Sequence, residues 1–170
     1  MKMKRKVIEI EHLKIETFYE YDSLFRSILL QYKECYDEAL KDVFLYTLSD
    51  YIRYRYHGYR ILYVPSSRKK LEERGFNHLE LIFENLDMEE AKGLRMIEEL
   101  VQEGQDRQSR RKMVSNYIYE GEHLDKVLVV DDVVTTGSTM LGIDRAICEK
   151  INNARYMALA RIEKTLSKKT

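Results

Sequence analysis

The chain has 170 residues, of which 44% are hydrophobic and 34% are charged. This hydrophobic fraction excludes a disordered chain, and the length allows about 70% of the unfolded surface to be buried around one core. The 29 Lys and Arg residues balance the 29 Asp and Glu residues. A net charge of zero excludes a general attraction to nucleic acid or anionic membranes, so any such contact must come from a local patch.

The sequence predicts one domain over residues 1–170, because it contains one proline and no linker-like stretch or repeat. Two cysteines, Cys35 and Cys148, are too few for a disulfide framework and indicate reduced thiols. The basic N-terminus lacks the apolar run of a signal peptide, and no stretch reaches the roughly 20 apolar residues of a membrane span. We therefore expect a cytoplasmic protein without a membrane contact.

The first half of the chain predicts a hairpin followed by helices. Residues 6–11 and 14–21 are rich in β-branched and aromatic residues, which favour two strands joined by a turn near His12. Apolar residues then recur at helical spacing over 24–32 and again over 40–52.

The second half alternates strand and helix patterns. An apolar run over 59–64 predicts a buried strand that ends at Pro65, and the segment 87–102 fits a helix or a strand. Further patterns predict helices over 79–86 and 140–147 and strands over 115–119, 127–130 and 156–162. This order predicts an α/β fold with a mostly parallel sheet flanked by helices, in which ligands bind beyond the carboxyl ends of the strands.

The segment Val127–Thr139 reads VLVVDDVVTTGST and carries the strongest functional pattern. Its aliphatic run should bring Asp131 and Asp132 together at the sheet edge. At roughly 6 Å and an effective dielectric of 20, their carboxylates would repel by about 3 kcal/mol. A hydroxyl donor, a cation or protonation of one carboxylate must relieve this repulsion.

A hydroxyl-rich turn follows the acidic pair and leads into a helix. It consists of Thr135, Thr136, Gly137, Ser138 and Thr139. Unpaired N–H groups and the helix dipole favour a phosphate there, and glycine permits a close approach. A ligand with a phosphate, vicinal hydroxyls and bound Mg²⁺ would suit both the hydroxyl-rich turn and the acidic pair. The ion would be held mainly through the ligand and in part by Asp131 and Asp132. The alternative is an ordinary strand–turn–helix with a chance Asp pair.

Two further segments are cationic. Ser66, Ser67, Arg68 and Lys69 follow the strand that ends at Pro65, where they fit a pyrophosphate or simply a solvated helix start. Gln105–Lys112, QDRQSRRK, fits a loop that closes over pyrophosphate, a surface hairpin tip, or a contact with single-stranded DNA beside the stacking faces of Tyr117 and Tyr119. The four histidines are scattered, which favours packing or surface roles.

The stretch VLVVDDVVTTGST resembles the phosphoribosyl-pyrophosphate signature of type I phosphoribosyltransferases. The stretch VPSSRKKLEERGFNHLEL resembles the same region of the ComF/GntX-type phosphoribosyltransferase-like family. The spaced Gln105, Ser109 and Asn116, and the upstream Tyr21-Asp22 pair, Arg26 and Lys33, also match that family's pattern. The resemblance covers about residues 18–162. Two departures are the missing zinc-binding module at the N-terminus and Met113 in place of an arginine, which leaves Arg111 or Lys112 to substitute.

The resemblance implies a type I phosphoribosyltransferase fold with residues 1–21 as a small N-terminal hood. It implies an enzyme that binds 5-phosphoribosyl 1-pyrophosphate with Mg²⁺ and transfers the phosphoribosyl group to a nitrogen acceptor. The implied catalytic residues are Asp131, Asp132 and Arg68. The implied ribose-5-phosphate contacts are Asp131, Asp132, Thr135, Thr136, Gly137, Ser138 and Thr139. The implied pyrophosphate contacts are Ser66, Ser67, Arg68 and Lys69. The implied loop or hood contacts are Arg74, Asn77, Gln105, Arg110 and Arg111.

The same resemblance implies a second function from another class. It connects the chain to DNA uptake in competence, as a non-catalytic accessory protein that binds single-stranded DNA or a helicase-like partner. The pattern leaves the oligomeric state and the acceptor open.

Overall fold

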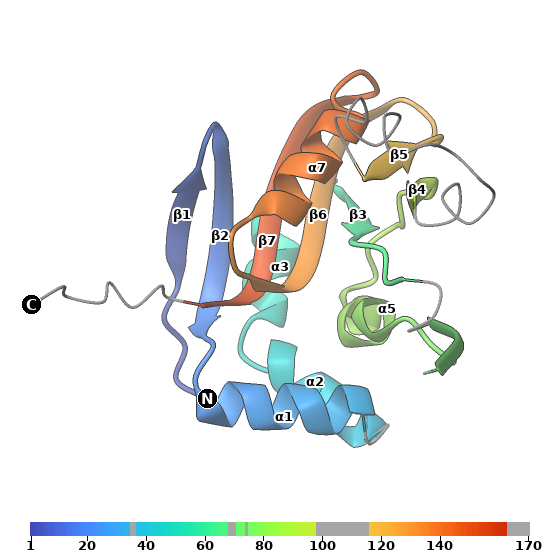
Figure 1. Ribbon diagram of the computed structural model, residues 1–170. Helices are drawn as coiled ribbons and strands as arrows, with labels where there is room; N and C mark the ends of the chain where they lie inside the picture. The colour runs from blue at the N-terminus through green and yellow to red at the C-terminus, as the bar shows by residue number, and fades with distance from the viewer. Residues whose placement is uncertain (35–36, 68–70, 74, 98–115, 163–170) are drawn as a thin grey trace, which may run out of the picture.

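A computed structural model describes residues 1–34, 37–67, 71–73, 75–97 and 116–162. Its centre is a five-stranded sheet in the order β1-β2-β7-β6-β3 (Figure 1). The strands are β1 (Lys6–Ile10), β2 (Leu13–Glu20), β3 (Arg60–Tyr63), β6 (Leu124–Val134) and β7 (Ile151–Arg161). Strands β2, β7, β6 and β3 are parallel, and β1 is antiparallel to β2. The predicted α/β fold with a mostly parallel sheet is therefore confirmed.

The N-terminal hairpin forms where it was predicted, and its second strand joins the central sheet. Ile10 pairs with Leu13 across the turn, and β2 pairs in parallel with β7. The reason lies in β2 itself, because its residues Ile15–Tyr19 are all buried. Consecutive buried residues in a strand point to both faces, so β2 needs a covering layer on each side.

Helices cover both faces of the sheet. Ile15 of β2 is in register with Tyr156 of β7, whose hydroxyl donates to Asp144 in α7 (Ser138–Ile147). The next residue, Glu16, accepts hydrogen bonds from Tyr51 and Tyr56 at α3 (Ser49–Arg55). Because neighbouring side chains of a strand point to opposite faces, α7 and α3 lie on opposite sides of the sheet. Figure 1 shows α7 in front of β6 and β7, with α3 behind.

The remaining elements surround this core. They are α1 (Ser23–Glu34), the 3-10 turn η1 (Glu38–Leu40), α2 (Lys41–Leu45), α5 (His78–Phe83), the 3-10 turn η2 (Glu84–Leu86), and the small sheet of β4 (Leu94–Met96) and β5 (Tyr117–Tyr119). The helical pattern over 40–52 is interrupted between α2 and α3. There the Leu45 carbonyl accepts from the Leu48 N–H and from the Ser49 hydroxyl, which satisfies the end of α2 locally.

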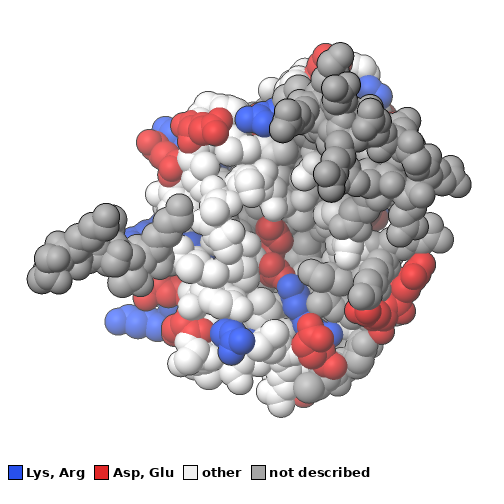
Figure 2. All heavy atoms as spheres, viewed as in Figure 1, with Lys and Arg blue, Asp and Glu red and all other residues white. Residues whose placement is uncertain are grey.

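Charges of both signs are interspersed over the described residues on the face shown in Figure 2. This distribution agrees with the balanced composition. None of the described helices combines the length and the hydropathy that a membrane crossing requires.

Candidate functional site

The acidic pair lies where one strand of the sheet ends and its neighbour continues. Pairing between β3 and β6 stops at Tyr63 and Val130, whereas pairing between β6 and β7 extends to Val134. Asp131 and Asp132 are therefore inside β6 and beyond the carboxyl end of β3. The sequence predicted that both aspartates follow the end of their own strand. In the structure they lie inside β6, and the site is at a sheet edge because the neighbouring strand β3 ends earlier.

The side chains of Asp131 and Asp132 leave β6 in opposite directions, because they are neighbours in an extended strand, but the charge of Lys33 acts on both carboxylates. Asp132 faces α1 and α5. Its Oδ2 accepts a hydrogen bond from His78 Nε2 at 2.9 Å and forms an ion pair with the Lys33 ammonium. The Asp132 side chain is only 11% exposed, so a cation and a second donor stabilise a nearly buried carboxylate.

Asp131 is in a different electrostatic environment. Its Oδ1 accepts the backbone N–H of Asp132 at 2.8 Å. Burial raises the pKa of Asp131 to about 6, and the positive charge of Lys33 offsets part of that rise. The repulsion expected from the sequence is thus relieved in two ways. Asp132 has a cationic partner, and Asp131 binds a proton more readily than an ordinary aspartate.

The hydroxyl-rich turn follows directly and begins α7. Thr135, Thr136 and Ser138 are exposed, and the Thr136 and Ser138 hydroxyls lie 3.0 Å apart. Gly137 has φ +75°, and an added Cβ there would lie 2.3 Å from Ile10 Cδ1. The positive φ favours glycine at this position. The turn presents hydroxyls at the N-terminus of a ten-residue helix, as an anion site requires.

Only some of the residues that were predicted to contact pyrophosphate, or to lie in the loop or hood, are among the described residues. Ser66 and Ser67 are half-buried and follow β3. Asn77 is the N-cap of α5, where its side chain accepts the Leu79 N–H at 3.1 Å and donates to Glu80. The other predicted contacts lie outside the described residues, namely Arg68, Lys69, Arg74, Gln105, Arg110 and Arg111.

The prediction that Tyr119 offers a stacking face to a nucleic-acid base is wrong. Tyr119 is 6% exposed and donates its hydroxyl to the Glu122 carbonyl, so its ring packs inside and is not available to a base. Tyr117 is half-buried.

Sequence reasoning missed the role of His78, which was expected to pack or to lie on the surface. Its partner Asp132 is 54 residues away, and no local pattern reports such a contact. The sequence pointed to Lys33 only through the family resemblance. It did not predict the ion pair of Lys33 with Asp132, which is 99 residues away in the chain.

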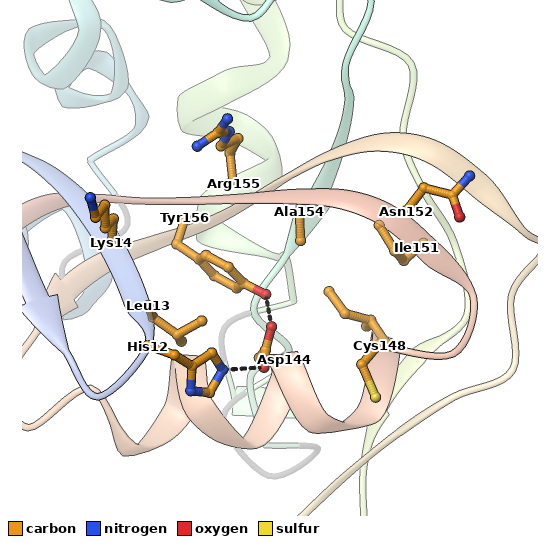
Figure 3. Close-up of a pocket in the computed structure, with 11 residues that line it drawn as sticks. His12, Leu13, Lys14, Asp144, Cys148, Ile151, Asn152, Ala154, Arg155 and Tyr156 are labelled. Atoms are coloured by element: carbon orange, nitrogen blue, oxygen red, sulfur yellow. Dashed lines mark hydrogen bonds and ion pairs between the residues drawn. The ribbon is translucent and has the colours of Figure 1, made fainter.

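A second polar cluster lies at the opposite ends of the strands (Figure 3). It lines a pocket of about 300 Å³ next to Leu13 and Ile151, which begin β2 and β7. Asp144 of α7 accepts from His12 Nε2 at 2.8 Å and from the Tyr156 hydroxyl at 2.5 Å. These bonds tie the hairpin turn and β7 to α7, which makes the cluster a structural link between elements.

The described residues offer few ligands for a metal. Among them, no group of three His, Cys, Asp or Glu side chains is arranged to hold an ion. The Lys33 ammonium already pairs with Asp132 Oδ2, and a second cation at that oxygen would be repelled.

Together, the fold and this geometry define an α/β domain with a polar site at the carboxyl end of its sheet. No protein-family model matches the chain. The chain is similar to "Competence protein ComFC" of Streptococcus pneumoniae (strain ATCC BAA-255 / R6), with 27% identity over 133 residues. That match covers 77% of this chain and 60% of ComFC, so the chain spans less than two thirds of that relative's length.

Proposed function

We propose that this protein has a competence-related function, like that stated in the name of its streptococcal relative. The observation that carries this proposal is the 27% identity over 133 residues. The predicted ComF-type resemblance, which rests on separate motifs along residues 18–162, supports it.

A chimera tests this function. The matching region of ComFC would be replaced by this chain in Streptococcus pneumoniae, because the chain covers only 60% of that protein. We expect the chimera to restore transformation frequency in a strain that lacks ComFC. A chimera that is produced in soluble form and fails to restore transformation would contradict the proposal. A chimera that carries an unrelated α/β domain is the control.

For the site, we propose binding of a phosphorylated ribose, with 5-phosphoribosyl 1-pyrophosphate as the favoured ligand. The exposed hydroxyls of Thr135, Thr136 and Ser138 and the N-terminus of α7 suit its 5-phosphate. The carboxylates of Asp131 and Asp132 suit its vicinal hydroxyls, because ionised carboxylates accept strong hydrogen bonds. The parallel sheet is consistent with a type I phosphoribosyltransferase fold, which is part of this proposal.

A transfer reaction is the second candidate function at the same site. The observation that favours it is the juxtaposition of the carboxylates and the hydroxyl-rich turn beyond the end of β3. A nitrogen nucleophile would attack C1 of the sugar as the bond to pyrophosphate breaks, and pyrophosphate would leave with its electron pair. Ser66 and Ser67 would donate hydrogen bonds to the leaving group, and Arg68 and Lys69 would neutralise its charge. Mg²⁺ would supply further charge neutralisation when it arrives bound to the phosphates.

Calorimetric titration tests the site. We expect 5-phosphoribosyl 1-pyrophosphate to bind the wild-type protein more tightly with Mg²⁺ than without it. The double variant Asp131→Asn/Asp132→Asn should lose at least tenfold in affinity, since two charge-assisted hydrogen bonds are weakened. Asp50→Asn is the matched control, because the Asp50 carboxylate is fully exposed on α3. Equal binding by the double variant and the control would refute the site.

A further inference from the structure

We propose that Lys33 and His78 are positioning residues that hold the Asp132 carboxylate for the hydroxyls of a bound ribose. This inference rests on the proposed sugar-phosphate site. Its basis is a contact between three separate elements. Lys33 of α1 and His78 of α5 converge on Oδ2 of Asp132 in β6. The three side chains are 16%, 7% and 11% exposed, respectively.

Both donors approach the same oxygen. Within the described part of the chain, Oδ2 of Asp132 receives Lys33 and His78, and no hydrogen bond reaches Oδ1. Two donors on one oxygen fix the rotation of the carboxylate and stabilise its negative charge. The second oxygen is then left as an acceptor of known direction. A ribose hydroxyl is a donor that suits such an acceptor.

The positioning residues are themselves held in place. Asn77 caps the first turn of α5, which fixes the backbone at His78. The hydroxyl of Tyr32, the residue before Lys33 in α1, donates to the His78 carbonyl at 2.9 Å. Tyr32 is fully buried, so α1 and α5 are joined directly beside the ion pair. A site residue held by such a supporting layer keeps its geometry without a ligand.

This arrangement predicts a selective defect when the support is removed. Lys33 and His78 should influence the hydroxyl contacts of the sugar and leave the phosphate contacts at the hydroxyl-rich turn intact. A purely structural role, or a direct contact between Lys33 and phosphate, would instead weaken all sugar phosphates equally. The ratio of affinities for two sugars therefore separates the roles.

The test is calorimetric titration with ribose 5-phosphate and with 2,3-dideoxyribose 5-phosphate, which lacks both hydroxyls. We expect the wild-type protein to prefer ribose 5-phosphate. Lys33→Met and His78→Leu should reduce that preference about tenfold, the effect of a lost hydrogen bond to a charged group, with little change for the dideoxy sugar. Lys33→Arg should retain most of the preference. Lys41→Met is the control, because Lys41 pairs with Glu84.

Each outcome has a distinct meaning. Absence of any preference in the wild-type protein would refute the proposed sugar site. Loss of preference in Asp132→Asn but not in Lys33→Met or His78→Leu would overturn the positioning role alone. Equal losses for both sugars in Lys33→Met would also overturn it. Thermal melting verifies folding, and Lys33→Gln and His78→Gln provide the same comparison if the first variants do not fold.

Discussion

At the scale of single residues, Asp131 makes stability depend on pH. Its pKa in the folded protein is about 6, above the ordinary value of 3.8, because burial disfavours the carboxylate. Between these two values the folded protein keeps a proton that the unfolded chain releases, so stability falls as pH rises. Asp131→Asn removes this dependence. We expect the wild-type protein to lose about 1–3 kcal/mol relative to the variant between pH 4 and pH 6.

Chemical denaturation across this pH range measures the difference. The exposed Asp50→Asn variant is the control, and its stability curve should run parallel to that of the wild-type protein. If Asp131→Asn also runs parallel, the pKa of Asp131 is ordinary and its environment differs from the one described.

Gly137 is the second residue with a sharp prediction. An alanine there combines an unfavourable positive φ with a contact at 2.3 Å to Ile10 Cδ1. We expect Gly137→Ala to destabilise the protein by about 1–3 kcal/mol. The added variant Ile10→Ala should recover the steric part of that loss in a double-mutant cycle. Strict additivity of the two substitutions would show that the turn and the hairpin do not touch.

At the scale of elements, Glu16 connects the N-terminal hairpin to α3. Burial alone would raise its pKa, but the hydroxyls of Tyr56 and Tyr51 and the guanidinium of Arg5 lower the pKa below its ordinary value. A lowered pKa stabilises the folded protein above the unfolded value of 4.5, and this contribution is lost as pH falls. The network therefore anchors β2 to the helical layer at neutral pH.

Removal of one hydroxyl tests this anchor. We expect Tyr56→Phe to cost about 1–3 kcal/mol of stability at pH 7, because a buried carboxylate loses a donor at 2.5 Å. The cost should shrink in acid as Glu16 becomes protonated. Tyr54→Phe is the matched control, since Tyr54 lies in the last turn of α3, two residues before Tyr56, and is 87% exposed. Similar losses in both variants would exclude a specific anchor.

At the scale of the whole molecule, we propose that the competence function proposed above includes a contact with single-stranded DNA through the cationic segment Gln105–Lys112. Such a contact releases counterions, so binding should weaken steeply with salt. The triple variant Arg110→Ala/Arg111→Ala/Lys112→Ala should bind more weakly and with a shallower salt dependence. Fluorescence anisotropy with an oligothymidylate measures both. Identical salt slopes for the wild-type protein and the triple variant would exclude this segment as the contact.

Local patterns predicted the parts of the fold that depend on local burial. The aliphatic residues Val127–Val130 are completely buried in β6, as their uninterrupted run indicated. Local patterns could not predict the position of the hairpin in the sheet, because that position depends on which distant strand pairs with β2. The partners of Asp132 were hidden for the same reason. Lys33 and His78 reach it only after α1, α5 and β6 have packed together.

We propose that the sheet-edge site serves the competence-related function. The most direct test is transformation of Streptococcus pneumoniae whose ComFC carries this chain in place of its matching region, with and without Asp131→Asn/Asp132→Asn. We predict that the chimera with the native acidic pair restores transformation and that the double variant, produced at the same level, does not. Equal transformation by the two chimeras would contradict the claim.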